Sequence, residues 1–201
     1  MQRPRLKILR RLGTPLPGLT RKEARWKTYP PGAHGAGQRR RVSGYGARLR
    51  EKQKLRWHYG ISERQLQGVF EEASRQTGAT GEQLLALLER RLDSVVFRLG
   101  LAPTIPAARQ LVGHGHVLVN GARVDRAGFR VSAGDEIAVS PRGRRIADVA
   151  RAVEHGPEVK LPGWLAIDPG DPFRGRVVGA PMRADTPFIV DETAIVEFYA
   201  R

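Results

Sequence analysis

The segment from residue 91 to residue 139 constrains the fold of this chain more than any other part, because its apolar residues change from helical to strand spacing. They first recur at helical spacing, at Leu92, Val95, Val96 and Leu99. Gly100 follows them and is suited to the end of a helix. Thr104 can cap a second helix, and alternation then surrounds Asn120-Gly121, the strongest short-range hairpin signal. Gly134-Asp135 forms a further turn before a strand at 136–139. The segment predicts two short helices and a small antiparallel sheet.

Charge is distributed unevenly along the chain. The 201 residues hold 35 Lys and Arg against 20 Asp and Glu, a net charge of +15. Residues 1–58 hold 17 of the cations and only two acids, whereas residues 59–201 hold 18 of each sign. The whole excess therefore lies in the first 58 residues, and such one-sided charge points to a polyanion such as nucleic acid.

The composition also excludes some classes of protein. There is no cysteine, which rules out disulfides, thiol catalysis and cysteine-bound zinc, and fits a cytoplasmic location. No apolar run approaches the length of a membrane span, and residues 1–13 lack the apolar core of a signal peptide. We expect no membrane partner.

The first 60 residues read as a basic arm followed by a basic helix. Proline, glycine and arginine dominate residues 1–42, which predicts an extended arm that gains order on its partner. The arm ends in the cluster Arg39, Arg40 and Arg41. Ser43 can cap a helix through about Tyr59, which carries the stripe Arg48, Lys52 and Arg56 flanked by Arg50 and Lys54. Unpaired like charges on one helix face indicate an external anion.

The remaining elements complete an α+β chain. Ser62 with Gln65, and Thr80 with Gln83, form capping-box patterns, and a further helix is expected over about 146–153. Short strands are expected at 164–167, 176–178, 188–190 and 193–199. The predicted organisation is a basic extended arm (1–42), a helical domain (43–90, completed by about 190–201), an inserted two-helix and sheet module (91–155) and a short-strand continuation of that module (156–189).

Residues 91–139 closely resemble the RNA-binding module named after small-subunit ribosomal protein S-four. The matching groups are Arg91-Leu92-Asp93, Arg98-Leu99-Gly100, Ala108-Arg109-Gln110-Leu111-Val112, His114-Gly115-His116, Val119-Asn120-Gly121, Val131 and Gly134-Asp135. Segments 10–13, 16–20, 29–32, 49–54, 59–63 and 196–201 extend the likeness almost from end to end. The chain thus resembles the bacterial S-four family, in its zinc-free, cysteine-less branch.

The resemblance implies a function and a set of partners. It implies a structural protein of the small ribosomal subunit that binds a multi-helix junction in the 5′ domain of 16S ribosomal RNA, nucleates assembly and influences translational accuracy. It also implies contacts with ribosomal proteins S-five and S-three and with messenger RNA near its entry channel. The implied fold has a final strand that returns to the helical part. Charge and resemblance together nominate fifteen RNA-binding residues: Arg39, Arg40, Arg41, Arg48, Arg50, Lys52, Lys54, Arg56, Arg91, Arg109, Gln110, His114, His116, Asn120 and Arg123.

Two departures from the family pattern stand in this module. Ile105, followed by Pro106, occupies a position where a second basic residue is usual, and its loss is expected to remove one phosphate contact. Ala127-Gly128 replaces the usual Pro-Ser before the last strand. Neither departure removes a helix or the hairpin.

Two other classes of protein share features with this sequence. Residues 91–93 echo a catalytic tripeptide of pseudouridine synthases, but Asp93 lies inside the module's own first helix and no synthase-sized domain follows, so we expect no enzyme. A free-standing module, such as a ribosome-rescue or heat-shock factor, is typically shorter. We expect neither a cofactor nor a metal, because His114 and His116 lack a third ligand and the glycines of 32–37 lack the ending of a phosphate loop.

Three side chains keep two interpretations from the sequence alone. Arg98 can contact RNA or form an ion pair with Asp93 or Glu89. Trp57 and Tyr59 can stack on unpaired bases or pack against neighbouring helices.

Overall fold

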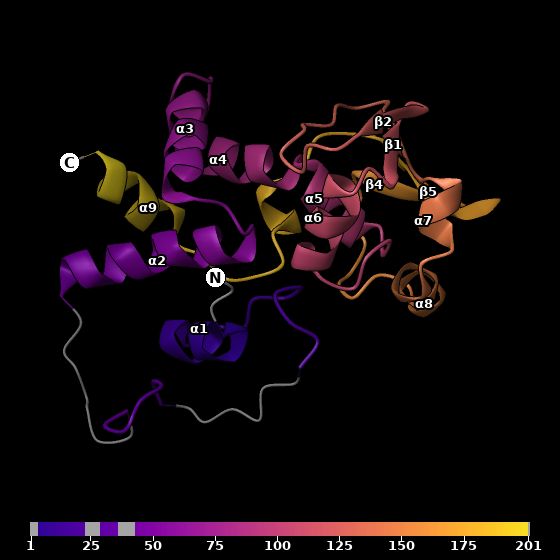
Figure 1. The fold of residues 1–201 in the computed structure, drawn as a ribbon. Helices are drawn as coiled ribbons and strands as arrows, with labels where there is room; N and C mark the ends of the chain where they lie inside the picture. The colour runs from indigo at the N-terminus through magenta and orange to yellow at the C-terminus, as the bar shows by residue number, and fades with distance from the viewer. Residues whose placement is uncertain (1–3, 23–28, 36–42, 201) are drawn as a thin grey trace.

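The structure is a computed structural model that describes residues 4–22, 29–35 and 43–200, and it has a helical half beside a half that combines helices with a sheet (Figure 1). The helical half consists of α1 (Arg5–Leu12), α2 (Gly44–His58), α3 (Glu63–Ser74), α4 (Thr80–Glu89) and α9 (Glu192–Tyr199). Within the described ranges, no helix is long and apolar enough to cross a membrane. The α+β class expected from the sequence is confirmed.

The mixed half is built on a five-stranded antiparallel sheet with the strand order β2-β1-β3-β5-β4. Its elements are α5 (Leu92–Arg98), α6 (Ile105–Gly113), β1 (Val117–Val119), β2 (Ala122–Val124), β3 (Glu136–Val139), α7 (Pro141–Arg144), α8 (Ala147–His155), β4 (Leu165–Asp168) and β5 (Asp171–Val177). A short 3-10 helix, η1 (Arg183–Asp185), leads back toward the helical half. The pairing of β1 with β2 confirms the predicted hairpin, and β3 confirms the strand expected after the second turn.

Local signals in the module act as the sequence indicates. The Thr104 hydroxyl accepts a hydrogen bond from the Ala107 amide at 3.2 Å and so caps α6. Asn120 (φ 50°) and Gly121 (φ 80°) both take the positive φ that a two-residue hairpin turn needs. Gly100 (φ 74°) follows α5 and ends it.

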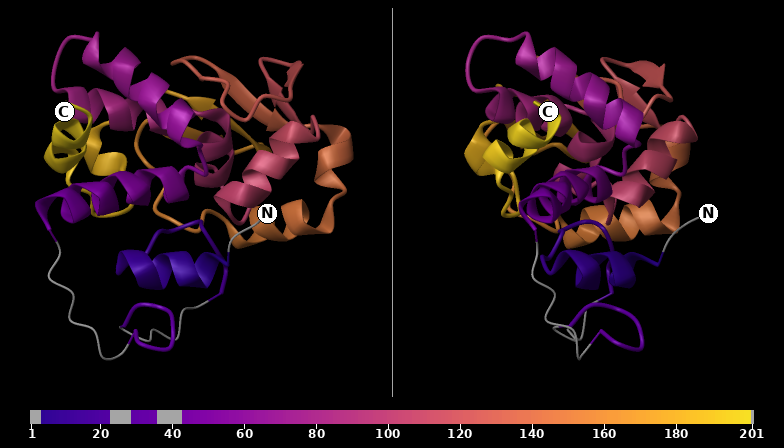
Figure 2. Two further views of the ribbon diagram at one scale, coloured as in Figure 1. Left: turned by 60° about the vertical axis from the view of Figure 1, so that its left-hand side comes forward. Right: turned by 90° about the vertical axis from the view of Figure 1, so that its left-hand side faces the viewer.

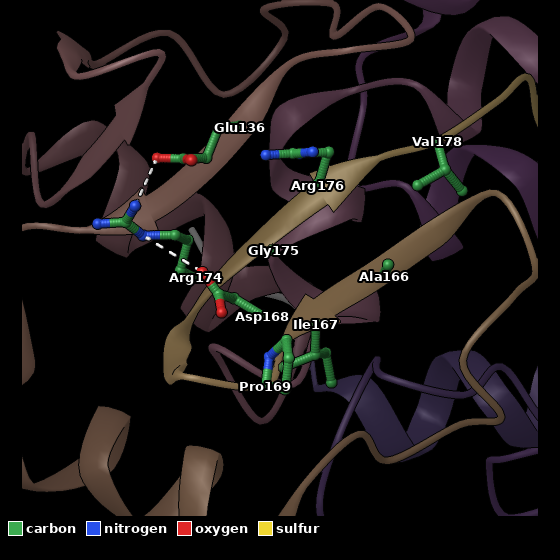
Figure 3. A pocket seen from close by; sticks show the side chains of 9 residues that line it. All are labelled: Glu136, Ala166, Ile167, Asp168, Pro169, Arg174, Gly175, Arg176 and Val178. Atoms are coloured by element: carbon green, nitrogen blue, oxygen red, sulfur yellow. Dashed lines mark ion pairs between the residues drawn. The ribbon is translucent and has the colours of Figure 1, made fainter.

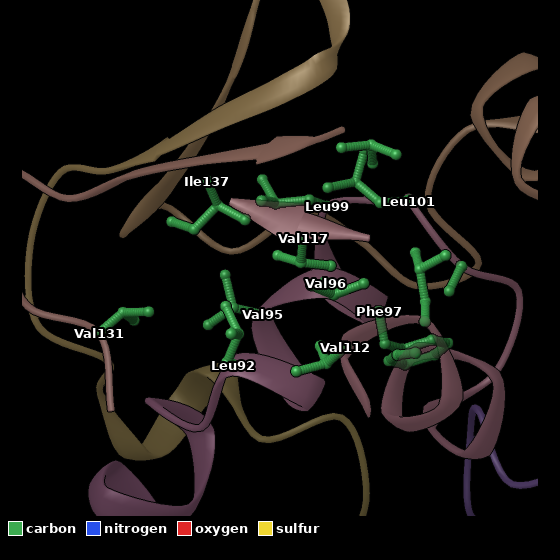
Figure 4. Packing of buried hydrophobic residues seen from close by; sticks show 14 of the residues in the cluster. Leu92, Val95, Val96, Phe97, Leu99, Leu101, Val112, Val117, Val131 and Ile137 are labelled. Atoms are coloured by element: carbon green, nitrogen blue, oxygen red, sulfur yellow. The ribbon is translucent and has the colours of Figure 1, made fainter. Parts of the chain in front are cut away.

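The core of the mixed half lies between the sheet and the helices α5 and α6 (Figure 4). Leu92, Val95 and Val96 of α5 are fully buried against Val117 of β1 and Ile137 of β3. Because burial of each such side chain contributes about 1.5–3 kcal/mol, this face of α5 anchors the module. The amphipathic pattern read from the sequence is confirmed here.

The helical half has its own core, and segments distant in the chain complete it. The two views of Figure 2 place α1 and α9 on different sides of α2. Leu9 and Leu12 of α1 and Ile195 of α9 are buried in the same cluster as Leu55 of α2 and Leu88 of α4. The expected extended conformation is therefore wrong for residues 5–12, whose leucines recur at the spacing of a helix face.

Two strands expected near the end of the chain are absent from the described residues. Residues 193–199 lie in helix α9 instead of a strand, so the final strand that the resemblance implied is wrong. The side chain of Asp191 caps this helix by accepting the Ala194 amide at 3.1 Å, and Ile195 is fully buried. Residues 188–190 form no strand, although Phe188 and Val190 are buried in the helical core.

Further boundaries agree or differ in detail. The Ser62–Gln65 capping box opens α3 as predicted, but α4 starts after Ala79 without a side-chain cap, so the predicted Thr80 cap is wrong. Helix α8 confirms the helix expected over about 146–153. Strand β5 begins five residues earlier than expected, at Asp171 rather than at residue 176.

Candidate nucleic-acid interface

Helix α2 turns its predicted basic stripe toward acidic residues of other elements. The Arg48 Nε atom bonds Glu197 at 2.6 Å, and the Lys52 Nζ atom bonds Glu63 at 2.6 Å. Arg56 lies 3.9 Å from Glu63. Only 5% of Lys52 is exposed. The expectation that this stripe lacks acidic partners is wrong, because the acids come from residues 11 and 149 positions away in the chain.

The ion pair at the centre of the stripe is further enclosed by aromatic rings of α9. The Lys52 ammonium lies 4.2 Å from the ring centroid of Phe198, and the Tyr199 hydroxyl donates to Glu63 at 3.1 Å. Burial acts to raise the pKa of Glu63, but the hydrogen bonds from Lys52 and Tyr199 and the nearby cations together lower it. Burial, followed by the charge of Glu63, raises the pKa of Tyr199. Lys52 therefore connects α2 with α9 and α3.

The two cations that flank the stripe differ from each other. Lys54 is buried, and its ammonium bonds Glu51 at 2.9 Å and the Ile189 carbonyl at 3.4 Å. Arg50 is exposed and makes no ion pair with any other residue that the structure describes. Of the five α2 cations, Arg50 presents its charge most freely to a ligand.

Two arginines of the module are enclosed in ion pairs. Arg91 donates to both carboxylate oxygens of Asp93, at 3.0 and 2.8 Å, and is itself buried. Arg98 donates to both oxygens of Glu89 at 3.1 and 2.6 Å, and Glu89 also accepts the Tyr59 hydroxyl at 2.6 Å. The ion-pair interpretation of Arg98 and the packing interpretation of Tyr59 are confirmed. Arg91 was nominated as an RNA-binding residue, and here its guanidinium is occupied by Asp93.

Arg109 joins the two halves of the molecule. Its guanidinium donates to the Gly60 carbonyl at 2.9 Å, beyond the end of α2, and lies 3.6 Å from the Asp93 carboxylate. Its side chain remains 39% exposed, and its neighbour Gln110 is exposed. Burial raises the pKa of Asp93 despite the opposing charge of Arg91. Arg109 can contact a ligand while it fixes α6 to α2.

The base of the hairpin gathers several candidate residues on the surface. The rings of His114 and His116 lie 6.3 Å apart between centroids, and Arg123 lies against the glycine between them. Asn120 is exposed, but its amide donates to Asp135 at 2.8 Å and accepts the Glu136 amide at 2.9 Å. Its side chain therefore joins the hairpin turn to the start of β3, while the histidines and Arg123 remain accessible.

Some candidates lie outside the described residues, namely Arg39, Arg40 and Arg41, together with Gly37 at the end of the glycine-rich stretch.

The outer face of the sheet contains a hollow of about 300 Å³ (Figure 3). Arg174 spans it between Glu136, at 3.2 Å, and Asp168, at 4.0 Å, while the exposed Arg176 lies beside Gly175. Opposite charges compensate each other in this hollow, which therefore contributes little to an interface for a polyanion. No sequence pattern indicates this hollow, because its residues come from three strands.

The described part of the chain contains no group of three or more side chains suited to a metal ion. Asp93 is fully buried and paired with Arg91, so it is inaccessible to a substrate base. The accessible chemistry is hydrogen bonding and positive charge.

A basic helical half joined to a helix-pair and hairpin module defines a class of RNA-binding protein, and comparison with known proteins specifies the class. The S4 domain matches residues 90–137, and the ribosomal protein S4/S9 N-terminal domain matches residues 1–89.

Curated relatives extend the match over nearly the whole chain. The small ribosomal subunit protein uS4B of Nitrosomonas europaea is 48% identical over 198 residues, which are 98% of this chain and 96% of the relative. The uS4 proteins of Geobacillus stearothermophilus and Trichormus variabilis are 47% and 50% identical over the same length, covering 97% and 96% of those relatives. The chain therefore belongs to the uS4 family, the S-four family of small ribosomal subunit proteins.

Proposed function

We propose that this chain is a structural component of the small subunit of the cytoplasmic ribosome and binds 16S ribosomal RNA directly. The observation that carries the proposal is the likeness to uS4 proteins over 98% of the chain. The net charge of +15, all of it in residues 1–58, supplies the physical reason. Cations that neutralise phosphates release condensed counterions, and this release supplies much of the affinity for RNA.

The finer functions follow from the family resemblance. They are recognition of a multi-helix junction in the 5′ domain, an early place in assembly and an influence on translational accuracy. The same resemblance supports contacts with ribosomal proteins S-five and S-three and with messenger RNA near its entry channel. The exposed His114 and Arg123 at the hairpin base are suited to reading RNA shape through backbone contacts. No catalytic role is proposed.

A binding assay at several salt concentrations tests the proposal. The purified chain is titrated against the 5′ domain of 16S-type RNA and against an RNA duplex of equal length. We expect tight binding to the 5′ domain that stays selective as salt rises. Equal, salt-sensitive binding to both RNAs would leave only a generic polycation and would contradict the proposed function.

Two variants of α2 separate charge that faces RNA from charge that holds the fold. Arg50→Ala removes an exposed cation, so the slope of log Kobs against log salt should flatten by about 0.7 units for one contact. Lys52→Met removes a buried cation with a protein partner, so it should lower stability and leave the slope unchanged. If Lys52→Met flattened the salt slope and Arg50→Ala did not, α2 would bind RNA through the face that carries Lys52 and not through the face that carries Arg50.

A further inference from the structure

Helix α7 and the base of the hairpin together form a surface with three exposed arginines. Arg123 follows the hairpin turn on β2, and Arg142 and Arg145 lie in and just after α7. None of the three side chains forms an ion pair or a hydrogen bond within the described ranges 4–22, 29–35 and 43–200. Contacts within the fold therefore do not explain why three arginines lie exposed on this surface.

Contacts between the two elements make this surface continuous. The Ser140 amide, at the start of α7, donates to the His116 carbonyl at 2.8 Å. A Cβ atom on Gly143 would lie 3.0 Å from the Cβ of His116, so α7 packs closely against that residue. On the other side of the loop, a Cβ on Gly115 would lie only 2.0 Å from the Arg123 Nε atom. Gly115 and His116 thus lie between Arg123 and α7, with Gly115 next to Arg123 and His116 next to α7.

Helix α7 distributes its arginines between two roles. Arg144 donates to both carboxylate oxygens of Asp171, at 3.1 and 2.6 Å, and to the Val139 carbonyl at 3.1 Å. Arg142 and Arg145, three positions apart, project from the same side of the turn and remain exposed. The fold thus uses Arg144 internally and leaves its two neighbours to solvent.

Acidic residues close to this surface in the chain are few and mostly occupied. Asp135 accepts hydrogen bonds from Asn120 and from the Ser132 amide, Glu136 pairs with Arg174, and Asp148 pairs with Arg151. Asp125 is exposed and offsets one of the three arginine charges. A net positive surface without a hollow suits an extended polyanion better than a small anion.

We propose that Arg142 and Arg145 extend the surface formed by Arg123, His114 and His116 into one continuous phosphate-binding surface for RNA. The proposal rests on the proposed function and extends the RNA contact of the module from the hairpin onto α7. Each planar guanidinium can hold a phosphate through two parallel hydrogen bonds. The surface contacts the RNA backbone and adds affinity without reading sequence.

The test compares two double variants of the full chain that remove the same charge. Arg142→Gln/Arg145→Gln alters the proposed surface, and Arg64→Gln/Arg176→Gln alters two exposed arginines elsewhere that form no ion pair with the described residues. Binding to the 5′ domain of 16S-type RNA is measured from 0.1 to 0.5 M salt. At about 0.7 units of slope per contact, the first variant should flatten the slope by about 1.4 units and weaken binding on the order of 25-fold at 0.1 M salt. The control should leave the salt slope unchanged and should alter the affinity by no more than about twofold.

A conservative variant distinguishes charge from geometry. Arg142→Lys/Arg145→Lys keeps both charges, so it should restore the salt slope but only part of the affinity, because lysine lacks the planar fork. Thermal unfolding of every variant should match the wild type, since the replaced side chains are exposed.

The outcomes separate this inference from the proposed function. Selective binding by the wild type, together with an undiminished Gln double variant, would overturn the inference alone and would direct attention to an acidic protein partner. A wild type that fails to prefer the 5′ domain would overturn the proposed function, and the inference with it.

Discussion

The buried pair between Glu89 and Arg98 offers the sharpest test of how the two halves are held together. Glu89 ends α4, Arg98 ends α5, and their side chains are 1% and 2% exposed. The Tyr59 hydroxyl donates to the same carboxylate, and burial, followed by the charge of Glu89, raises the pKa of that tyrosine. The network therefore joins the end of α2 to both halves.

The variant Glu89→Gln should destabilise the protein strongly. It removes the charge that compensates Arg98 and leaves a guanidinium enclosed without a counter-charge. Breaking a buried pair in this way costs about 3–5 kcal/mol. Domains of ordinary stability unfold with only about 5–15 kcal/mol, so the loss should be obvious in urea unfolding at neutral pH.

The double variant Glu89→Gln/Arg98→Met supplies the decisive comparison. It removes both charges and fills the space with an apolar chain, so most of the lost stability should return. The resulting coupling free energy should exceed about 2 kcal/mol in a double-mutant cycle. Glu82→Gln, at an exposed acid of the same helix, should stay within about 0.5 kcal/mol of the wild type. A loss below about 1 kcal/mol for Glu89→Gln, or additive losses in the double variant, would refute the reasoning.

Further predictions concern a buried histidine, two glycines and the hairpin turn. Burial lowers the pKa of His58 well below its ordinary value of 6.5, so only the unfolded chain takes up a proton as the pH falls below 6.5. Unfolding free energy should therefore drop by up to about 1.4 kcal/mol per pH unit in that range for the wild type and for His155→Gln, but not for His58→Leu. Gly18→Ala should lower the unfolding free energy, measured with denaturant, by about 2–4 kcal/mol, because the φ of Gly18 is 76° and its new Cβ would lie 2.5 Å from an aromatic ring of α5. Gly13 has a similar φ of 68° but open space around it, so Gly13→Ala should cost only about 1 kcal/mol. Asn120→Gly should lower the free energy of unfolding by about 1–2 kcal/mol, because it removes the two side-chain hydrogen bonds of Asn120. Asn120→Ala should cost about 1 kcal/mol more, because alanine is also strained at the positive φ of this position. Equal losses for the two variants in thermal unfolding would contradict this explanation of the turn.

The module could be predicted from sequence because its signals are local. The Thr104 hydroxyl caps α6 by accepting the amide of Ala107, three positions away, and Asn120-Gly121 forms the turn that joins two adjacent strands. Such signals require only a few neighbouring residues, so they remain valid in almost any surrounding structure. The helix pair, the hairpin and the second turn were therefore predicted correctly.

The charged groups of α2 show what local reasoning misses. The stripe of cations appears uncompensated in the sequence because Glu51 is the only acid among residues 43–59. Its partners Glu63 and Glu197 arrive through the folding of α3 and α9. Pairing between distant segments is a property of the tertiary fold, and a single sequence does not reveal it.

Helix α9 shows a second kind of failure. The β-branched residues Thr193, Ile195 and Val196 favour a strand by propensity. The tertiary fold overrides this preference, because a helix lets Ile195 enter the helical core while Phe198 and Tyr199 cover Lys52. The Asp191 cap was visible in the sequence and, together with the four-residue spacing of Ile195 and Tyr199, could have indicated the helix.

The closure of the helical core by segments far apart in the chain has a consequence for synthesis. Chains emerge from the ribosome with their N-terminal residues first, and units fold as their contacts become available. The mixed half has all its strands once residue 177 has emerged, but the helical half needs Ile195 to fill its core. We therefore expect the mixed half to form first during translation, although α1 to α4 are made earlier. The apolar faces of α1 to α4 would then stay partly exposed until α9 is synthesised and packs against them.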